Sequence, residues 1–155
     1  MYFVDKAKRT NRCGELRLGH VDNKVVLMGW VHRNRDFGGQ IFITLRDVSG
    51  IVQLRFDQGT ESFELASTIR QEWVIGIEGV VASRGENINR KMDTGEIEVV
   101  VSRVDVLSKS DPVPFSVEED SDALEENRLK YRYIDLRRPP LQKRLRAKSE
   151  ANSLI

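Results

Sequence analysis

A single cysteine, Cys13, stands among the 155 residues. One cysteine excludes an intramolecular disulfide and any metal site built from cysteines, and it fits a reducing compartment. No apolar run near the start resembles a signal peptide, and no stretch is long enough to span a bilayer. From these absences we expect a cytoplasmic protein without a membrane partner.

The sequence also lacks a strong net charge. Its formal charge is +1, which excludes a global field that would steer the whole chain toward nucleic acid or membrane. The charges are unevenly placed, however. Residues 117–127 hold six acids and no base, and residues 128–148 hold nine bases and one acid. The acidic run predicts a linker, and the basic run predicts the start of a different segment.

Recognisable catalytic patterns are missing as well. The sequence has no phosphate-binding loop and no catalytic triad pattern, and its two histidines, His20 and His32, have no partner at a spacing typical of metal ligands. We therefore predict no catalytic residue, no metal ligand and no cofactor for these 155 residues, and whether the chain is an enzyme stays open at this point.

Alternating and β-rich segments dominate the first 110 residues. Five of them are predicted as strands, with one short helix of period 3.6 between the third and the fourth. The strands are expected at 24–31, two within 40–57, 72–83 and 96–110, and the helix at 60–71. This order predicts an all-β protein, a five-stranded Greek-key barrel of the OB-fold type. The segment 32–39, which contains a glycine pair, is expected to form a loop.

Three regions follow from the same pattern. Residues 1–110 are predicted as the OB-fold domain and 111–139, with its prolines and acids, as a linker or hinge. Residues 140–155 begin an amphipathic helical pattern that is still running at Ile155. We therefore expect the chain to be a piece of a longer protein, with a helical extension at this end.

Phe42 breaks the alternation of the second strand. Ile41, Ile43 and Leu45 share one face, while Phe42 lies among the polar residues of the other. OB-folds bind oligonucleotides on the face of strands two and three, and single-stranded RNA is read by stacking unpaired bases on aromatic rings. The alternative is that a loop or a neighbouring domain covers Phe42, and the pattern alone does not separate the two.

Polar residues around the same face are further candidates for RNA contact. Amides, arginines and carboxylates can bond to base edges or phosphates, although each of these residues also has an ordinary role in a turn or on a solvated surface. The candidates are Arg33, Arg35, Gln53, Arg84, Asn87, Asn89 and Glu98.

Several segments resemble one family, the bacterial type of aspartyl-tRNA synthetase, a class II enzyme. They include "GWVHRNRDFGGQIFITLRD", "GIVQLRF", "NINRKMDTGEIEV" and "RLKYRYIDLRRP", and the resemblance covers nearly the whole chain. It implies an N-terminal OB domain that binds the tRNA anticodon, then a linker, then a catalytic domain that begins just after "LRRP". On this basis the sites for ATP and Mg²⁺ are expected beyond Ile155, and the full-length protein is expected to be a homodimer.

The resemblance also implies individual roles. Phe42 matches an aromatic residue that stacks on the central anticodon base, a uridine, and Arg35 and Gln53 match residues that contact anticodon bases. The partner would be aspartate tRNA, with asparagine tRNA left open. Thr44 and Val48 depart from the family pattern, which has Asp and Arg there.

Two other functions remain open from the residues themselves. One is a free-standing OB module that binds single strands without sequence preference, and the other is a partner-binding domain in which Phe42 lies in the interface. We also expect the basic segment 128–148 to be poorly ordered or artificially packed, because Leu141, Leu145 and Leu154 would pack against a domain beyond the chain.

Overall fold

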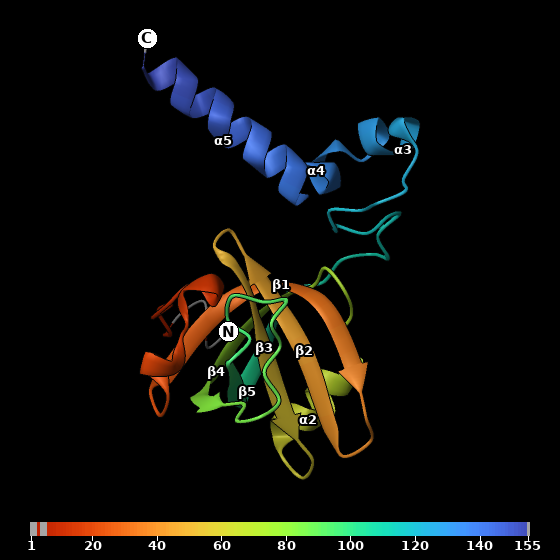
Figure 1. Ribbon diagram of the computed structural model, residues 1–155. Helices are drawn as coiled ribbons and strands as arrows, with labels where there is room; N and C mark the ends of the chain where they lie inside the picture. Colours follow the sequence, from red (N-terminus) through yellow and green to blue (C-terminus); the bar gives the residue numbers. More distant parts are fainter. Residues whose placement is uncertain (1–2, 4–5, 155) are drawn as a thin grey trace. The chain divides into compact units, whose positions relative to one another are not determined.

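A computed structural model describes Phe3 and residues 6–154 of the chain. The chain forms two compact units, and the division falls between Ser110 and Asp111 (Figure 1). Among the described residues, the strands lie in the first unit, and the second unit consists of helices and irregular segments.

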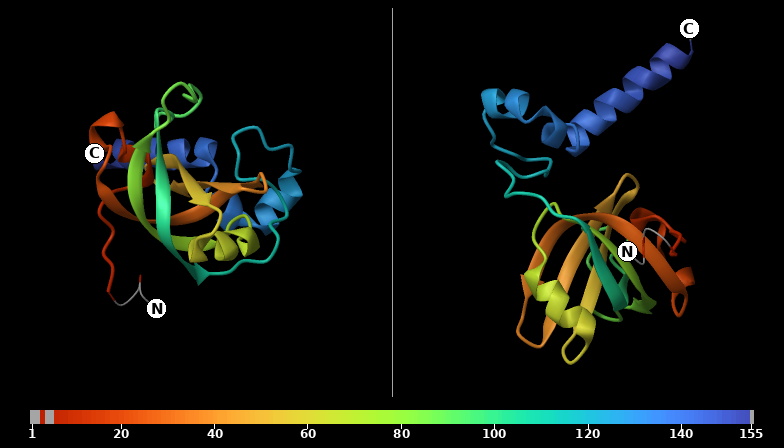
Figure 2. Two further views of the ribbon diagram at one scale, coloured as in Figure 1. Left: turned by 90° about the horizontal axis from the view of Figure 1, so that it is seen from below. Right: turned by 180° about the vertical axis from the view of Figure 1, so that it is seen from behind.

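The first unit is a closed barrel of five strands, as predicted (Figures 1 and 2). Its elements are the short 3-10 helices η1 (Cys13–Glu15) and η2 (Leu18–His20), strands β1 (Lys24–Asp36), β2 (Gln40–Asp47), β3 (Gly50–Asp57), β4 (Val74–Ser83) and β5 (Ile97–Ser108), and helix α2 (Glu61–Thr68). Around the barrel the strands follow the order β1-β2-β3-β5-β4. Only β3 and β5 pair in parallel, and the other neighbours are antiparallel. The OB-fold prediction is confirmed.

Alternation of side chains builds the core of the barrel. Ile41, Ile43 and Leu45 of β2 point inward with no exposed surface, and Leu54 and Phe56 of β3 do the same. Each such side chain contributes about 1.5–3 kcal/mol through burial. The alternate residues of β2 and β3 consequently form the outer face of these strands, and the candidate site lies on that face.

Strand β1 is longer than the sequence predicts. The expected loop at 32–39 is wrong in its first half, because β1 continues to Asp36. Its first part pairs with β4 and its second part with β2, and the register shifts between Val31 and Arg33. The sequence of residues 32–36 resembles a loop because a polar residue, Asn34, takes the inward position. The Asn34 amide donates to the backbone oxygens of Ala66 and Ile69 at 3.1 and 2.9 Å.

Helix α2 lies across one end of the barrel (Figure 2). Thr60 caps its first turn, because its hydroxyl oxygen accepts a hydrogen bond from the Phe63 amide at 3.2 Å. Phe63, Leu65 and Ala66 pack against the barrel core, which confirms the apolar side predicted for this helix.

The second unit contains helices α3 (Glu125–Lys130), α4 (Arg132–Asp135) and α5 (Pro139–Ser153). The Arg138 guanidinium holds its chain segments together, donating to the backbone oxygens of Glu118 and Glu119 at 3.0 and 2.8 Å and to Asp135 Oδ1 at 3.1 Å. Helix α5 buries none of its residues, and among all described helices none is long and apolar enough to cross a membrane.

Candidate nucleic-acid interface

Two rows of side chains cross the outer face of β1, β2 and β3. In one row Arg35 pairs with Phe42, and Phe42 pairs with Arg55. In the next row Arg33 pairs with Thr44, and Thr44 pairs with Gln53. The register thus brings together four of the predicted residues and adds Arg55 and Thr44, which were not predicted as contacts. We call this surface the β1–β3 face.

Phe42 is half-buried on this face, and a second aromatic ring touches it. The rings of Phe37 and Phe42 meet edge to face, with centroids 5.8 Å apart and planes at 70°. Phe37 lies between β1 and β2 and is itself 69% exposed. The loop therefore shields one edge of Phe42 without burying the pair. Phe37 was missed from the sequence, although an aromatic residue beside a glycine pair in a polar segment is a usable signal.

A hydrogen-bonded network links β3 to β5 beside this pair. Gln53 Nε2 donates to Glu98 Oε2 at 3.0 Å, and Arg55 Nη1 donates to the other carboxylate oxygen, Glu98 Oε1. Glu98 is only 6% exposed, whereas an ordinary outward strand glutamate would be solvated. Arg55 Nε also reaches Asp57 Oδ2 at 3.3 Å. The network therefore fixes the side chains of Gln53 and Arg55 on the β1–β3 face.

The two arginines of β1 carry positive charge to the same face. Arg33 and Arg35 are both exposed, and they project from a paired strand rather than from the predicted loop. Within the part of the chain that the structure describes, the Arg35 guanidinium makes no hydrogen bond to protein. It is available for a phosphate or a base edge.

The segment between β4 and β5 carries Arg84, Asn87 and Asn89. Asn89 forms a turn, since its side-chain oxygen accepts from the Lys91 amide at 3.1 Å. In residues 6–154 no side-chain hydrogen bond joins these three residues to the β1–β3 face. Arg84 Nη1, however, is buried without a hydrogen-bond partner among the described residues. An unsatisfied buried donor is costly.

Cys13 lies outside this interface. Its side chain is fully buried, and burial, followed by the nearby charge of Asp47, raises the pKa of the thiol far above its usual value. Such a thiol is a structural apolar group and not a nucleophile. Among the described residues there is also no group of three or more His, Cys, Asp or Glu side chains that could hold a metal ion.

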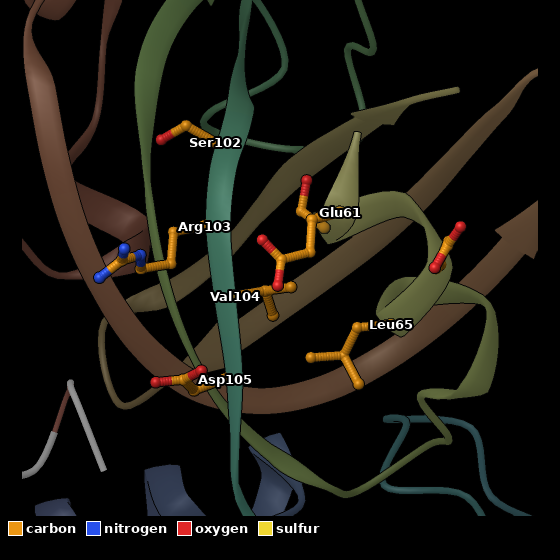
Figure 3. A pocket seen from close by; sticks show the side chains of 8 residues that line it. Glu61, Leu65, Ser102, Arg103, Val104 and Asp105 are labelled. Carbon is orange, nitrogen blue, oxygen red and sulfur yellow. The ribbon is translucent and has the colours of Figure 1, made fainter. Parts of the chain in front are cut away.

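The barrel also has a hollow of about 600 Å³ between α2 and β5 (Figure 3). Three carboxylates line it, those of Glu61, Glu64 and Asp105, together with one base, Arg103. None of the predicted site residues lies in this hollow. Its acidic lining disfavours a polyanion, so the β1–β3 face remains the candidate for nucleic acid.

Comparison with known proteins agrees with the geometry. A family model described as an OB-fold nucleic acid binding domain matches residues 25–107, which is more than half of the chain. An aspartate–tRNA(Asp/Asn) ligase of Anaeromyxobacter sp. (strain K) is 46% identical over 154 residues, which cover 98% of this chain and 26% of that protein. The chain thus spans about a quarter of the length of this relative.

Solved structures give the same result. An asparaginyl-tRNA synthetase from Pyrococcus horikoshii, complexed with asparaginyl-adenylate, has a TM-score of 0.71 at 30% identity, covering 85% of this chain and 29% of that one. An aspartyl tRNA synthetase from Entamoeba histolytica has a TM-score of 0.85 at 20% identity, covering 95% and 36%, and shows the shared fold. The barrel, its polar outer face with an aromatic pair, and the matched family model agree: the chain belongs to the family of OB-fold nucleic acid binding domains.

Proposed function

We propose that the barrel binds the anticodon of a tRNA, and that Phe42 stacks on its central base. The observation that carries the proposal is the position of Phe42, a large aromatic ring on the polar outer face, between Arg35 and Arg55 in the strand register. A stacked base contributes about 1–3 kcal/mol, judged by alanine substitution. Arg35, which is exposed, supplies positive charge for a phosphate that flanks the base.

The other predicted residues have complementary roles in this proposal. Gln53 presents an amide to a base edge, and Arg33 and Arg35 contact phosphate or base. Arg84, Asn87 and Asn89 reach the anticodon loop from the β4–β5 segment. Because phosphate contacts release counterions, affinity should fall as salt rises, while the preference for one base should persist.

For the full-length protein we propose an aspartate–tRNA ligase. Such an enzyme makes aspartyl-adenylate from ATP, with Mg²⁺, and transfers aspartate to tRNA. The relatives that match over about a quarter of their length support this proposal. In this proposal the catalytic part of the full-length protein would bind ATP and Mg²⁺. A cytoplasmic location and a homodimer belong to the same proposal.

The tRNA partner is aspartate tRNA, and asparagine tRNA is a second candidate. Several of the relatives are described as aspartate–tRNA(Asp/Asn) ligases. The two anticodons differ at the third base, so the choice depends on side chains near that base and not on the stack at Phe42.

The test is binding of a fluorescent anticodon stem-loop, followed by anisotropy at low and moderate salt. The wild-type chain should bind the aspartate loop more tightly than loops in which another base replaces the central uridine. At higher salt we expect weaker binding of the aspartate loop and of the altered loops, with an unchanged ratio of their affinities. No binding to any loop would favour a partner-binding domain instead.

A second candidate function gains support from Phe37. Binding of single strands without sequence preference usually relies on several stacking rings, and the Phe37–Phe42 pair supplies two. Equal affinity for all loops and for an unstructured oligonucleotide would favour this function over anticodon recognition.

A further inference from the structure

The amide of Gln53 can lie in either of two orientations, and Glu98 fixes which one it takes. An amide turned by 180° exchanges its donor and acceptor ends. In the structure Nε2 faces Glu98 Oε2 at 3.0 Å. A carboxylate only accepts hydrogen bonds, so the opposite orientation would place two acceptor oxygens against each other.

Glu98 itself has little freedom to move. Its second oxygen accepts from Arg55 Nη1, and its side chain is 8% exposed. It projects from β5 between Ile97 and Val99, both of which are fully buried in the barrel core. Thr44, which lies opposite Gln53 on β2, can donate or accept and therefore tolerates both orientations. Glu98 is thus the group that selects one.

The selected orientation gives the outer end of Gln53 a defined pattern. Among the described residues, Oε1 and the second N–H of Nε2 have no protein partner, so they form a fork with one acceptor and one donor. Uracil offers a donor at N3 and an acceptor at O4, whereas cytosine offers an acceptor at N3 and a donor at N4. For a base held in one place, a fork of fixed order therefore fits only one of these two pyrimidines.

We propose that Glu98 is a positioning residue that makes the site select uridine over cytidine, by holding the Gln53 amide in a single orientation. This inference rests on the proposed function, because it takes the central anticodon base as the ligand of Gln53. It adds a second role to the expectation that Glu98 bonds to a base directly, because each of its oxygens already accepts one hydrogen bond from the protein.

The Glu98→Gln variant changes this orientation without changing shape. Arg55 can only donate, so the amide introduced at this position would turn its oxygen to Arg55 and its NH₂ group to Gln53. The Gln53 amide would then turn its own oxygen inward, and the outer fork would reverse. The expected result is a gain of about tenfold or more in affinity for a stem-loop with a central cytidine, with a matching loss for uridine.

The experiment measures both loops by anisotropy with the wild-type chain, the Glu98→Gln variant and matched control variants. Glu96→Gln removes the same charge from an exposed position beside β5, so it reports any general gain from lower negative charge. Glu98→Gln combined with Gln53→Leu should show no cytidine gain, because the fork is gone.

Each result supports or overturns the proposal. The proposal is supported if Glu98→Gln gains more affinity for the cytidine loop than Glu96→Gln does, and if this gain disappears when Gln53→Leu is added. An unchanged ratio of uridine-loop to cytidine-loop affinity in Glu98→Gln, or an equal loss of affinity for both loops, overturns it. A wild-type chain with no uridine preference would instead overturn the proposed function itself, so the two failures are distinct.

Discussion

Removing the guanidinium of Arg46 should cost the barrel a large part of its stability. Arg46 Nη2 contacts both carboxylate oxygens of Glu72, at 2.8 and 2.9 Å, and the side chains are 12% and 0% exposed. Removing one partner of a buried ion pair costs about 3–5 kcal/mol, because the other charge stays buried. A domain of this size has a total stability on the order of 5–15 kcal/mol. We therefore expect Arg46→Met to lose about 3 kcal/mol or more.

Urea unfolding, followed by tryptophan fluorescence, measures this loss. Trp30 lies opposite Arg46 in the β1–β2 register, and Trp73 follows Glu72 in the chain, so the signal reports on the region of the change. The Arg46→Met/Glu72→Gln double variant should lose less than the sum of the single variants, since it removes both charges together.

Arg35→Met provides the matched control. This arginine is exposed on the same strand pair, and its replacement should change stability by no more than about 0.5 kcal/mol. A stability loss below about 1 kcal/mol in Arg46→Met, the range of a surface ion pair, would contradict this expectation. Simple addition of the two single losses in the double variant would contradict it as well.

Three further results are expected. The Cys13 thiol should resist a thiol reagent at pH 8 in the native protein and react after unfolding, because burial and the charge of Asp47 raise its pKa; rapid native labelling would contradict this. Burial opposes ionisation of Asp47, but hydrogen bonds from Ser49 and Cys13 outweigh it and lower the pKa of this carboxyl. The stability that this carboxylate contributes is therefore present above its unfolded pKa of about 3.9 and is lost as pH falls through the lower folded pKa. Urea unfolding at pH 5 and at pH 3 should show a smaller loss of stability for Asp47→Asn than for wild type. Equal losses would show that Asp47 has no lowered pKa in the folded protein. Finally, Phe37→Ala should weaken binding of the anticodon stem-loop by about 1 kcal/mol, the contribution of an edge-to-face aromatic pair, and unchanged anisotropy titrations would show that Phe37 supports no stack.

The sequence predicts the parts of the fold that depend on side-chain alternation. Ile41, Ile43 and Leu45 alternate with polar residues, so the inner face of β2 follows directly from the pattern. The second half of β1 does not, because a register shift after Val31 and the inward Asn34 interrupt the alternation. Propensity alone cannot reveal such a shift, since it is set by pairing with two different neighbours.

The candidate site divides in the same way. Phe42 could be predicted because one residue departs from its local pattern. The contact between Gln53 and Glu98 could not, because the two residues are 45 positions apart and meet only through the parallel pairing of β3 with β5. The sequence was enough to select each residue as a candidate. The hydrogen bond by which Glu98 orients Gln53 could be found only in the structure.

The proposed function depends on stacking of the Phe42 ring on a base, and one set of titrations measures that stacking. A labelled aspartate anticodon stem-loop is titrated at low salt with wild type, Phe42→Tyr, Phe42→Leu and Phe42→Ala. Leucine keeps apolar bulk but has no aromatic face. We expect the tyrosine variant to retain affinity, and the leucine and alanine variants each to lose about 1–3 kcal/mol of binding free energy. Wild-type affinity in the leucine variant would show that Phe42 supplies only apolar bulk, and wild-type affinity in the alanine variant would show that no base stacks there.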